Sequence, residues 1–318
     1  MALRGGIDLG GTKVEAIVVD DGHEIRGQAR RPTPTEGGPP AVVRELAAAL
    51  REAAAAAGVE PSSLAGVGVG SPGEVDTAAG TVARAGNLPE WDGVFPLADE
   101  LGRALGVHVA VGNDVRLAVE AERVLGAGRE HRSFLGVWWG TGVGGALVLD
   151  GKLWLGRGMA GELGHVVVKE GGRRCQCGRR GCVEAYAGRG SMERRARKAE
   201  ELGTKTKLFE IMRKRDRTRL TSGVWKVALE RRDDLAVALV TEAIDALGAA
   251  IGSVQNLADL DAIVIGGGLG TRLGQPYVER IAEAAQRHLF VADKPPAFAL
   301  SELGDIGGGL GAALLVSA

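Results

Sequence analysis

A histidine and all three cysteines of this 318-residue chain lie close together in the sequence. They are His165, Cys175, Cys177 and Cys182, which offer one imidazole and three thiolates. This ligand set suits a tetrahedral zinc ion with no open coordination position, as in structural zinc sites. The cluster therefore predicts a structural zinc that fixes the surrounding segment.

Three other interpretations compete with zinc. A disulfide needs paired cysteines and an oxidising compartment, but the cysteine count is odd and no charged-then-apolar signal segment opens the chain. Three reduced structural thiols would be scattered through apolar strands rather than gathered in a loop of arginine and glycine. The last alternative is a knuckle that binds nucleic acid through Arg173, Arg174, Arg179 and Arg180.

Two carboxylates flank the cluster and predict a pocket for a sugar. Glu162 precedes the histidine by three residues and Glu184 follows the last cysteine by two, so a bound metal would fix both. An acceptor-rich pocket suits a neutral polyol, whose hydroxyls donate hydrogen bonds. The alternative is that these are surface residues without a ligand. The other polar residues expected in the pocket are Asn87, Asn113 and Asp114.

Asp114 is the predicted general base. A strand over 107–111 runs into Gly112-Asn113-Asp114, and a helix is expected over 115–125. An aspartate at such a joint can accept a proton from a substrate hydroxyl, while Asn113 offers both a donor and an acceptor. The alternative role is helix N-capping, for which Asn and Asp are preferred.

Two similar glycine turns predict contacts with phosphate. The first, Asp8-Leu-Gly-Gly-Thr-Lys13, joins two β-type runs, so it is neither a Walker P-loop nor a Rossmann fingerprint. Its backbone N–H groups can form an anion-binding nest, and Asp8 can hold a hydrated magnesium ion. Residues 134–151 repeat this design around Thr141 and Gly142. Each turn alone could be an ordinary hairpin, but the pair predicts a two-sided phosphate clamp.

A third glycine turn, Gly266–Gly270, follows a buried strand and precedes a helical segment. It can let an adenine and ribose approach the backbone, although an ordinary strand-to-helix turn has the same pattern. The GxGxxG match over 68–73 opens no helix and is treated as a decoy. The predicted nucleotide-binding residues are Asp8, Gly10, Gly11, Thr12, Lys13, Thr141, Gly142, Gly266, Gly267 and Gly268.

Composition limits the classes of partner. The net charge is −1, which gives no global electrostatic reason to expect nucleic acid or an anionic membrane. Apolar runs are short and broken by glycine, so no stretch is expected to cross a bilayer and the chain is predicted to be cytoplasmic. The length suggests two domains. Strands alternate with helices, which predicts α/β layers, and the similar hairpins suggest two related lobes.

Several separated motifs resemble one family across nearly the whole chain, the ROK (repressor, open reading frame, kinase) sugar kinases of the actin-like ATPase superfamily. They are Asp8-Leu-Gly-Gly-Thr-Lys13, Asn113-Asp114, Gly140-Thr-Gly-Val-Gly-Gly145, Gly161-Glu-Leu-Gly-His165, Cys175-Gln-Cys-Gly-Arg-Arg-Gly-Cys182-Val-Glu184 and Gly266-Gly-Gly. The chain looks most like the bacterial glucokinases of this family.

The resemblance implies a two-lobed, ribonuclease H-like α/β fold that closes an inter-domain cleft on a hexose and ATP with Mg²⁺. We expect a smaller lobe of residues 1–114 plus 300–318 and a larger one of 115–299. Asp114 would be the base for phosphorylation of the 6-hydroxyl of glucose, and the histidine would bind both zinc and sugar. Dimers or tetramers are common in similar kinases. The sugar would be held by Asn87, Asn113, Glu162, His165 and Glu184.

Two features depart from the family pattern. Val115-Arg116 follows the Asn-Asp pair where the family usually has small residues and another asparagine, and no room precedes the first phosphate motif for the repressors' winged-helix domain. The alternatives are a kinase for fructose, allose, N-acetylmannosamine or N-acetylglucosamine, a glucokinase that uses polyphosphate, and a sugar-sensing regulator without catalysis.

Overall fold

The computed structural model describes residues 2–86 and 88–316. Asn87, a predicted sugar ligand, lies outside the described residues. The chain forms two compact units, Met1–Leu125 with Asp305–Ala318 and Gly126–Gly304. The lobe boundaries expected at 114/115 and 299/300 stay a prediction.

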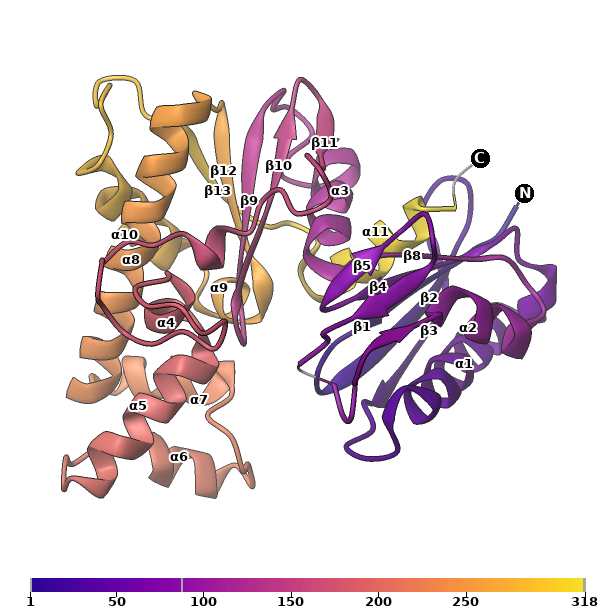
Figure 1. Cartoon of the computed structure of the whole chain (residues 1–318), viewed down its shortest axis with the longest axis horizontal. Coiled ribbons are helices and arrows are strands. Elements are labelled where there is room, and N and C mark those ends of the chain that lie inside the picture. Colours follow the sequence, from indigo (N-terminus) through magenta and orange to yellow (C-terminus); the bar gives the residue numbers. More distant parts are fainter. Residues whose placement is uncertain (1, 87, 317–318) are drawn as a thin grey trace. The chain divides into compact units, whose positions relative to one another are not determined.

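The first unit is built on a mixed five-stranded sheet in the order β3-β2-β1-β4-β8 (Figure 1). β1, β2 and β3 are antiparallel neighbours, whereas β4 and β8 continue parallel to β1. A small antiparallel sheet, β5-β6-β7, belongs to the same unit. The strands are β1 (Arg4–Leu9), β2 (Lys13–Val19), β3 (Ile25–Pro32), β4 (Val67–Ser71), β5 (Glu74–Asp76), β6 (Thr81–Ala83), β7 (Val94–Phe95) and β8 (Val109–Asn113).

Helices cover both faces of this sheet. Alanine and leucine side chains of α1 pack on apolar side chains of β1 and β2, and α2 lies beside α1. α3 and α11 pack together on the opposite face (Figure 1). A 3-10 turn, Pro61–Ser63, precedes β4, and another, Gly304–Ile306, precedes α11. The helices are α1 (Gly38–Ala56), α2 (Leu97–Leu105), α3 (Asp114–Leu125) and α11 (Gly307–Leu314).

Glycines let α11 lie directly on the sheet. A Cβ atom on Gly6 would lie 2.0 Å from the carbonyl oxygen of Gly309, and one on Gly68 would lie 1.7 Å from that of Ala312. Larger residues at either position would force the helix away from β1 and β4. The GxGxxG pattern over 68–73 thus has a packing role at its first glycine, and as predicted it opens no helix, since β4 ends at Ser71 and β5 begins at Glu74.

The second unit repeats the sheet topology of the first. Its strand order is β11-β10-β9-β12-β13, with β9, β10 and β11 antiparallel and β12 and β13 parallel to β9. The predicted internal repeat is therefore confirmed at the level of topology, which agrees with the predicted fold class. These strands are β9 (Phe134–Trp139), β10 (Val143–Leu149), β11 (Lys152–Trp154), β12 (Ala262–Gly266) and β13 (Ala297–Leu300).

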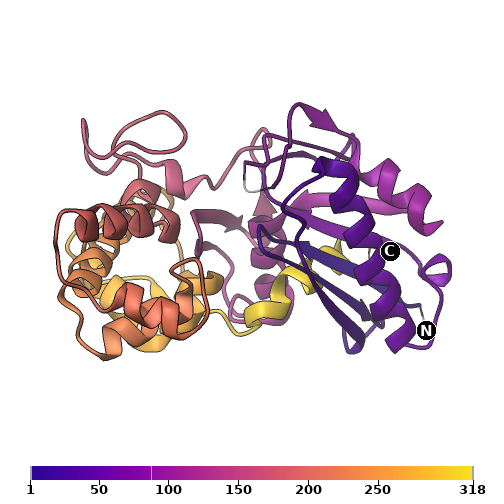
Figure 2. The same cartoon turned by 90° about the horizontal axis from the view of Figure 1, so that it is seen from below.

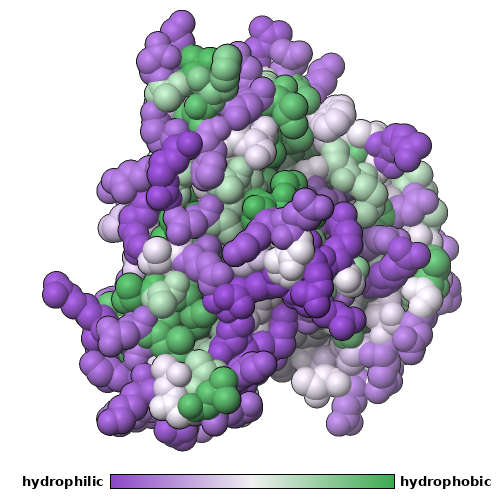
Figure 3. Space-filling view, turned by 60° about the vertical axis from the view of Figure 1, so that its left-hand side comes forward, coloured by the Kyte–Doolittle hydropathy of each residue, from purple (hydrophilic) through white to green (hydrophobic). Residues whose placement is uncertain are grey.

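The core of the second unit lies among its helices and β9, β10 and β12. Figure 2 shows α5 to α8 gathered side by side in this unit. Figure 3 shows apolar patches separated by polar side chains on the face of the protein that it presents. A 3-10 turn spans Leu163–His165. The helices are α4 (Glu184–Ala187), α5 (Arg189–Glu201), α6 (Leu208–Lys214), α7 (Ser222–Glu230), α8 (Asp234–Ala258), α9 (Gly267–Leu273) and α10 (Gln275–Gln286).

Two local predictions need correction. α8 is 25 residues long and apolar enough to span a membrane by length and composition, contrary to the expectation that no stretch is. Its apolar window is 61% buried, which is the pattern of a core helix. The composition of the Pro- and Gly-rich stretch over 32–40 favours a surface loop, but α1 begins at Gly38, because prolines are compatible with the first turn of a helix.

Candidate functional site

The first unit brings Asp8 and the Asn113-Asp114 pair to one edge of its sheet. Asp8 pairs with Gly70 of β4, and Gly70 pairs with Gly112 of β8. The carboxyl ends of these parallel strands therefore lie side by side, where ligands of open α/β sheets commonly bind. Asp114 is the first residue of α3 and is half-buried.

Asp8 has a perturbed carboxyl group. Its side chain faces the first turn of α11, where a Cβ on Gly308 would lie 2.7 Å from Cγ of Asp8. Burial and the nearby charge of Asp114 raise the pKa of Asp8 to about 7, and Lys13 opposes this shift. Burial and a nearby like charge make the ionised form of this carboxyl unfavourable, and a cation bound beside it would compensate the negative charge. The pair of carboxylates therefore fits the hydrated Mg²⁺ predicted for Asp8.

Asn113 caps α3, as one alternative foresaw. Its Oδ1 accepts a hydrogen bond from the backbone N–H of Arg116 at 3.2 Å, and Oδ1 of Asp114 accepts one from Val115 N–H at 2.9 Å. Capping holds the Asn-Asp pair in a defined orientation at the helix start, which is compatible with the predicted roles as sugar ligand and base.

The first phosphate hairpin is a tight turn held from one side. The N–H of Gly10 donates to the carbonyl of Lys13 at 2.9 Å, and the hydroxyl of Thr33 donates to the carbonyl of Gly10 at 2.6 Å. Gly11 and Thr12 at the tip are exposed. The tip of the turn is thus accessible to a ligand, as a phosphate nest requires.

Lys13 belongs to a charged network that the sequence analysis missed. Its ammonium contacts Glu15 at 2.7 Å and Asp305 at 3.4 Å. The Glu15 side chain is fully buried and also accepts hydrogen bonds from Arg30 and Gln28. An acidic residue within the apolar run of β2 was the available signal. Glu15 therefore restrains Lys13, the last residue of the predicted phosphate turn.

The second phosphate hairpin is braced by residues far away in sequence. Its turn closes through the N–H of Gly140, which donates to the carbonyl of Gly142 at 3.0 Å. The carboxylate of Glu184 accepts from Val143 N–H at 3.0 Å. The guanidinium of Arg189, which sequence analysis also missed, donates to the hydroxyl of Thr141 at 2.8 Å.

The glycine turn after β12 lies next to this hairpin. A Cβ on Gly140 would be 3.8 Å from the backbone nitrogen of Gly268. Gly267 has a φ of 81°, and a Cβ there would lie 2.7 Å from the backbone nitrogen of Trp139. Only glycine fits both the backbone angle and the space. The second unit therefore joins two predicted nucleotide-contacting turns, around Thr141 and around Gly267.

The histidine and the cysteines converge as predicted. Their four ligand atoms lie within 4.8 Å of one another. Sγ of Cys177 lies 3.7 Å from Sγ of Cys182, and Nδ1 of His165 lies 3.8 Å from Sγ of Cys175. A tetrahedral zinc ion with Zn–S bonds of about 2.3 Å separates its sulfur ligands by about 3.8 Å. The group therefore fits structural zinc, and the cysteines form no disulfide.

The segment of the four predicted zinc ligands lies next in sequence to two residues that are predicted to bind sugar, and one of these contacts the second predicted phosphate hairpin. Glu184 is the first residue of α4 and follows the last cysteine by two residues, so the predicted zinc ligands restrain its backbone. Its carboxylate accepts the hydrogen bond from Val143 N–H in the second hairpin. Glu162 is exposed just before the 3-10 turn that ends at His165. Two of the four arginines near the cysteines have structural partners: Arg173 pairs with Glu242, and Arg180 donates to the carbonyl of Gly172.

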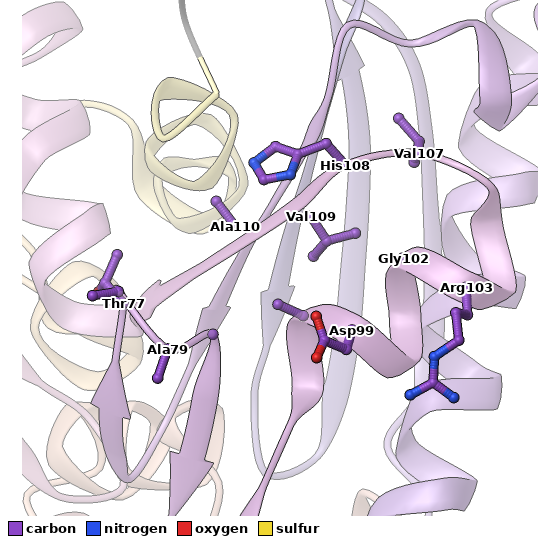
Figure 4. A pocket seen from close by; sticks show the side chains of 12 residues that line it. Thr77, Ala79, Asp99, Gly102, Arg103, Val107, His108, Val109 and Ala110 are labelled. Atoms are coloured by element: carbon purple, nitrogen blue, oxygen red, sulfur yellow. The ribbon is translucent and has the colours of Figure 1, made fainter.

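A separate cavity of about 410 Å³ lies in the first unit (Figure 4). It is lined by the turn between β5 and β6, by α2 and by the start of β8, with Thr77, Asp99 and His108 among its polar side chains. None of the candidate site residues that the structure describes lines it. The predicted catalytic and nucleotide-binding residues lie instead at the acidic edge of the first unit and in the glycine turns.

Comparisons with known proteins agree with this geometry. The model of the ROK family matches residues 4–318. The chain belongs to the ROK family. It is 33% identical to a glucokinase of Thermotoga maritima over 285 residues, which cover 87% of this chain and 86% of that protein. It is 32% identical to an N-acetylgalactosamine kinase of Shewanella sp. over 319 residues, covering 98% of this chain and 95% of that one.

A solved structure supports the same assignment. The ROK family glucokinase of Streptomyces griseus, crystallised with glucose and AMPPNP, has a TM-score of 0.83 and 31% identity, with 99% of each chain covered. The present chain is thus a ROK sugar kinase with the actin-like ATPase fold. Its relatives act on different sugars at similar identity, so the family assignment alone leaves the substrate open.

Proposed function

We propose that this sugar kinase is an ATP-dependent glucokinase that phosphorylates the 6-hydroxyl of glucose. The observation that carries the proposal is the acidic edge of the first unit, where Asp8 and Asp114 lie close enough for their charges to interact. Asp8 is suited to hold the water shell of a magnesium ion, and Asp114 is suited to accept a proton. The similarity to the glucokinases of T. maritima and S. griseus favours glucose.

In this mechanism Asp114 accepts the proton of the sugar hydroxyl. The hydroxyl oxygen forms a bond to the γ-phosphorus, the bond to the β–γ bridging oxygen breaks, and ADP leaves with the electron pair. Phosphoryl transfer relies chiefly on positioning and charge stabilisation, so an aspartate of ordinary basicity is sufficient. Mg²⁺, when bound, would neutralise charge on the phosphates, with Asp8 holding its water shell.

Zinc supports sugar binding indirectly in this proposal. The metal group would fix His165 and the start of α4, and the sugar hydroxyls would bond to Glu162, Glu184 and the imidazole Nε2. The N–H groups of the two hairpin turns would bind the phosphates, and Gly266–Gly268 would accept the adenosine. We also infer a cytoplasmic homo-oligomer, a dimer or a tetramer, which sedimentation velocity tests directly.

Replacement of Asp114 tests the proposed base. Asp114→Asn preserves shape and removes the proton acceptor, so kcat is expected to fall about 100-fold or more with little change in thermal unfolding. Asp99→Asn is the matched control, because Asp99 also lies in the first turn of a helix of the first unit and is exposed. Near-normal turnover by a folded Asp114→Asn variant would refute the assignment of the base.

The substrate is tested by ranking sugars by kcat/KM. Glucose should rank above fructose, allose and the N-acetylhexosamines, with ATP preferred to polyphosphate as donor. N-acetylgalactosamine belongs on the same panel because one relative carries that activity in its name. A higher kcat/KM for an N-acetylhexosamine would replace glucose, and sugar binding without turnover would favour the sugar-sensing regulator.

A further inference from the structure

Arg189 contacts the second phosphate hairpin through both its backbone and its side chain. It is the first residue of α5. Its N–H donates to the carbonyl of Gly140 at 3.1 Å, and its Nη2 donates to Oγ1 of Thr141 at 2.8 Å. The next N–H along the chain, that of Gly190, donates to the carbonyl of Thr141 at 2.9 Å. The start of α5 therefore fixes the turn that is predicted to bind phosphate.

The same guanidinium joins this hairpin to a third segment. Nη1 of Arg189 donates to the carbonyl of Leu220 at 3.0 Å. Leu220 lies just before α7, whose first residue is Ser222, and Oγ of Ser222 is 3.9 Å from a Cβ position on Gly268. Arg189 thus joins the segment around Thr141 to the segment around Leu220, and the latter leads into the helix that begins beside the segment around Gly268. Two of these are the predicted nucleotide turns of the second unit.

The positive charge of Arg189 is only partly compensated within the described part of the chain, by the nearby charge of Glu193. No carboxylate there forms an ion pair with it, because the nearby Glu193 pairs with Arg197 and Arg219 instead. Its Nε is buried and has no hydrogen-bond partner. A half-buried guanidinium with a spare donor is costly unless an anion approaches it. The adjacent glycine turns are suited to such an anion.

We propose that Arg189 is a positioning residue for the polyphosphate of the nucleotide, holding the Thr141 hydroxyl in place and supplying the positive charge beside it. This inference rests on the proposed kinase function of the same site. It assigns to the second unit the cationic group that the glycine turns themselves lack. It also predicts that the charge matters for the nucleotide and not for the sugar.

Two substitutions separate the charge from the hydrogen bonds. Arg189→Met keeps much of the side-chain volume without charge or donors, and KM for ATP is expected to rise about ten- to a hundred-fold, as for loss of hydrogen bonds from a charged group. Arg189→Lys keeps the charge but loses the two separate nitrogens of the guanidinium that bond Leu220 and Thr141, so an intermediate rise is expected. KM for the sugar should stay within about twofold, because no sugar contact is removed.

A matched control lies on the same helix. Arg194 donates to the hydroxyl of Ser191 at 3.0 Å and makes no contact with either glycine turn. Arg194→Met should therefore leave KM for ATP within about twofold. Thr141→Ala provides a double-mutant cycle: if Arg189 acts through Thr141, the effects of the two substitutions on KM for ATP will be smaller together than their product.

Nucleotide binding measured by calorimetry with AMPPNP and Mg²⁺, in the absence of sugar, distinguishes the possible failures. If the wild-type protein binds AMPPNP but phosphorylates no hexose, the proposed function fails, while weaker binding by Arg189→Met still supports this inference. If folded Arg189→Met, or Arg189→Lys should the Met variant not fold, binds AMPPNP and uses ATP like the wild type, the inference is overturned.

Discussion

Replacing Asp8 with asparagine should stabilise the protein while it removes activity. In the unfolded chain the Asp8 carboxyl has its ordinary pKa of 3.8, whereas burial and Asp114 raise its pKa to about 7 in the folded protein. At 1.36 kcal/mol per pKa unit, ionised Asp8 lowers the free energy of unfolding by up to about 4 kcal/mol. Asparagine has the same shape and no charge, so it removes this cost.

The sign and the pH window follow from the two pKa values. Between about pH 4 and pH 7 the unfolded chain has lost a proton that the folded protein still holds, so the free energy of unfolding falls as pH rises. Below this window both states hold the proton, and above it the cost is complete. The Asp8→Asn variant should therefore match the wild type near pH 4 and exceed it at pH 8.

The measurement is urea unfolding of both proteins from pH 4 to pH 8 in buffer without Mg²⁺ and without nucleotide. Asp92→Asn is the control, since Asp92 is exposed and its replacement should change stability equally little at every pH. Turnover of Asp8→Asn should fall at least about 100-fold, if Asp8 holds the hydrated Mg²⁺. A stability difference between Asp8→Asn and wild type that is independent of pH would refute the reasoning.

Three further perturbations test other parts of the site. Removing zinc with a chelator should lower the unfolding temperature and raise KM for the sugar, and an unchanged KM in protein shown by mass spectrometry to be zinc-free would contradict the supporting role. Glu15→Gln should lower the free energy of unfolding by about 3 kcal/mol at pH 7, because Lys13 and Arg30 lose their buried partner. Burial alone would raise the pKa of Glu15, but hydrogen bonds from Lys13 and Arg30 lower it. The loss of stability in Glu15→Gln is therefore present above pH 4.5 and should shrink as pH falls further. Urea unfolding that shows the same loss at pH 7 and at pH 3 would contradict this reasoning. Gly308→Ala places a methyl group 2.7 Å from Cγ of Asp8 and should reduce kcat about tenfold or more by displacing the carboxylate, so a variant with wild-type kcat would show that the position of Asp8 is unimportant.

Short-range features of the site could be predicted from the sequence. The four predicted zinc ligands lie within 18 residues, from His165 to Cys182, and both predicted phosphate turns lie within single hairpins. Because so few residues join the members of each group, their types and spacing leave few possible backbone conformations. The Asn113-Asp114 pair was likewise located by the strand and helix on either side of it.

Long-range partners could not be predicted in the same way. Asp8 meets Gly308 because α11 packs on β1, and Arg189 meets Thr141 because α5 begins beside the second hairpin. Neither pairing leaves a local signal, since an arginine at a helix start and a glycine within a helix occur in many proteins without any such contact. Only Glu15 was detectable, as an acidic residue in an apolar strand that needed buried partners.

The two units carry different residues at equivalent positions of their repeated sheets. Asp8 lies opposite Gly70 in the first sheet, and Trp138 lies opposite Gly266 at the equivalent position of the second. One position therefore carries a carboxylate and the other an indole, whose ring carbons lie about 3 Å from a Cβ position on Gly266. The first sheet edge gathers acidic groups that suit a metal ion and a proton. The second gathers glycine turns and an arginine that suit phosphate, so the charge of each edge complements a different part of the proposed reaction.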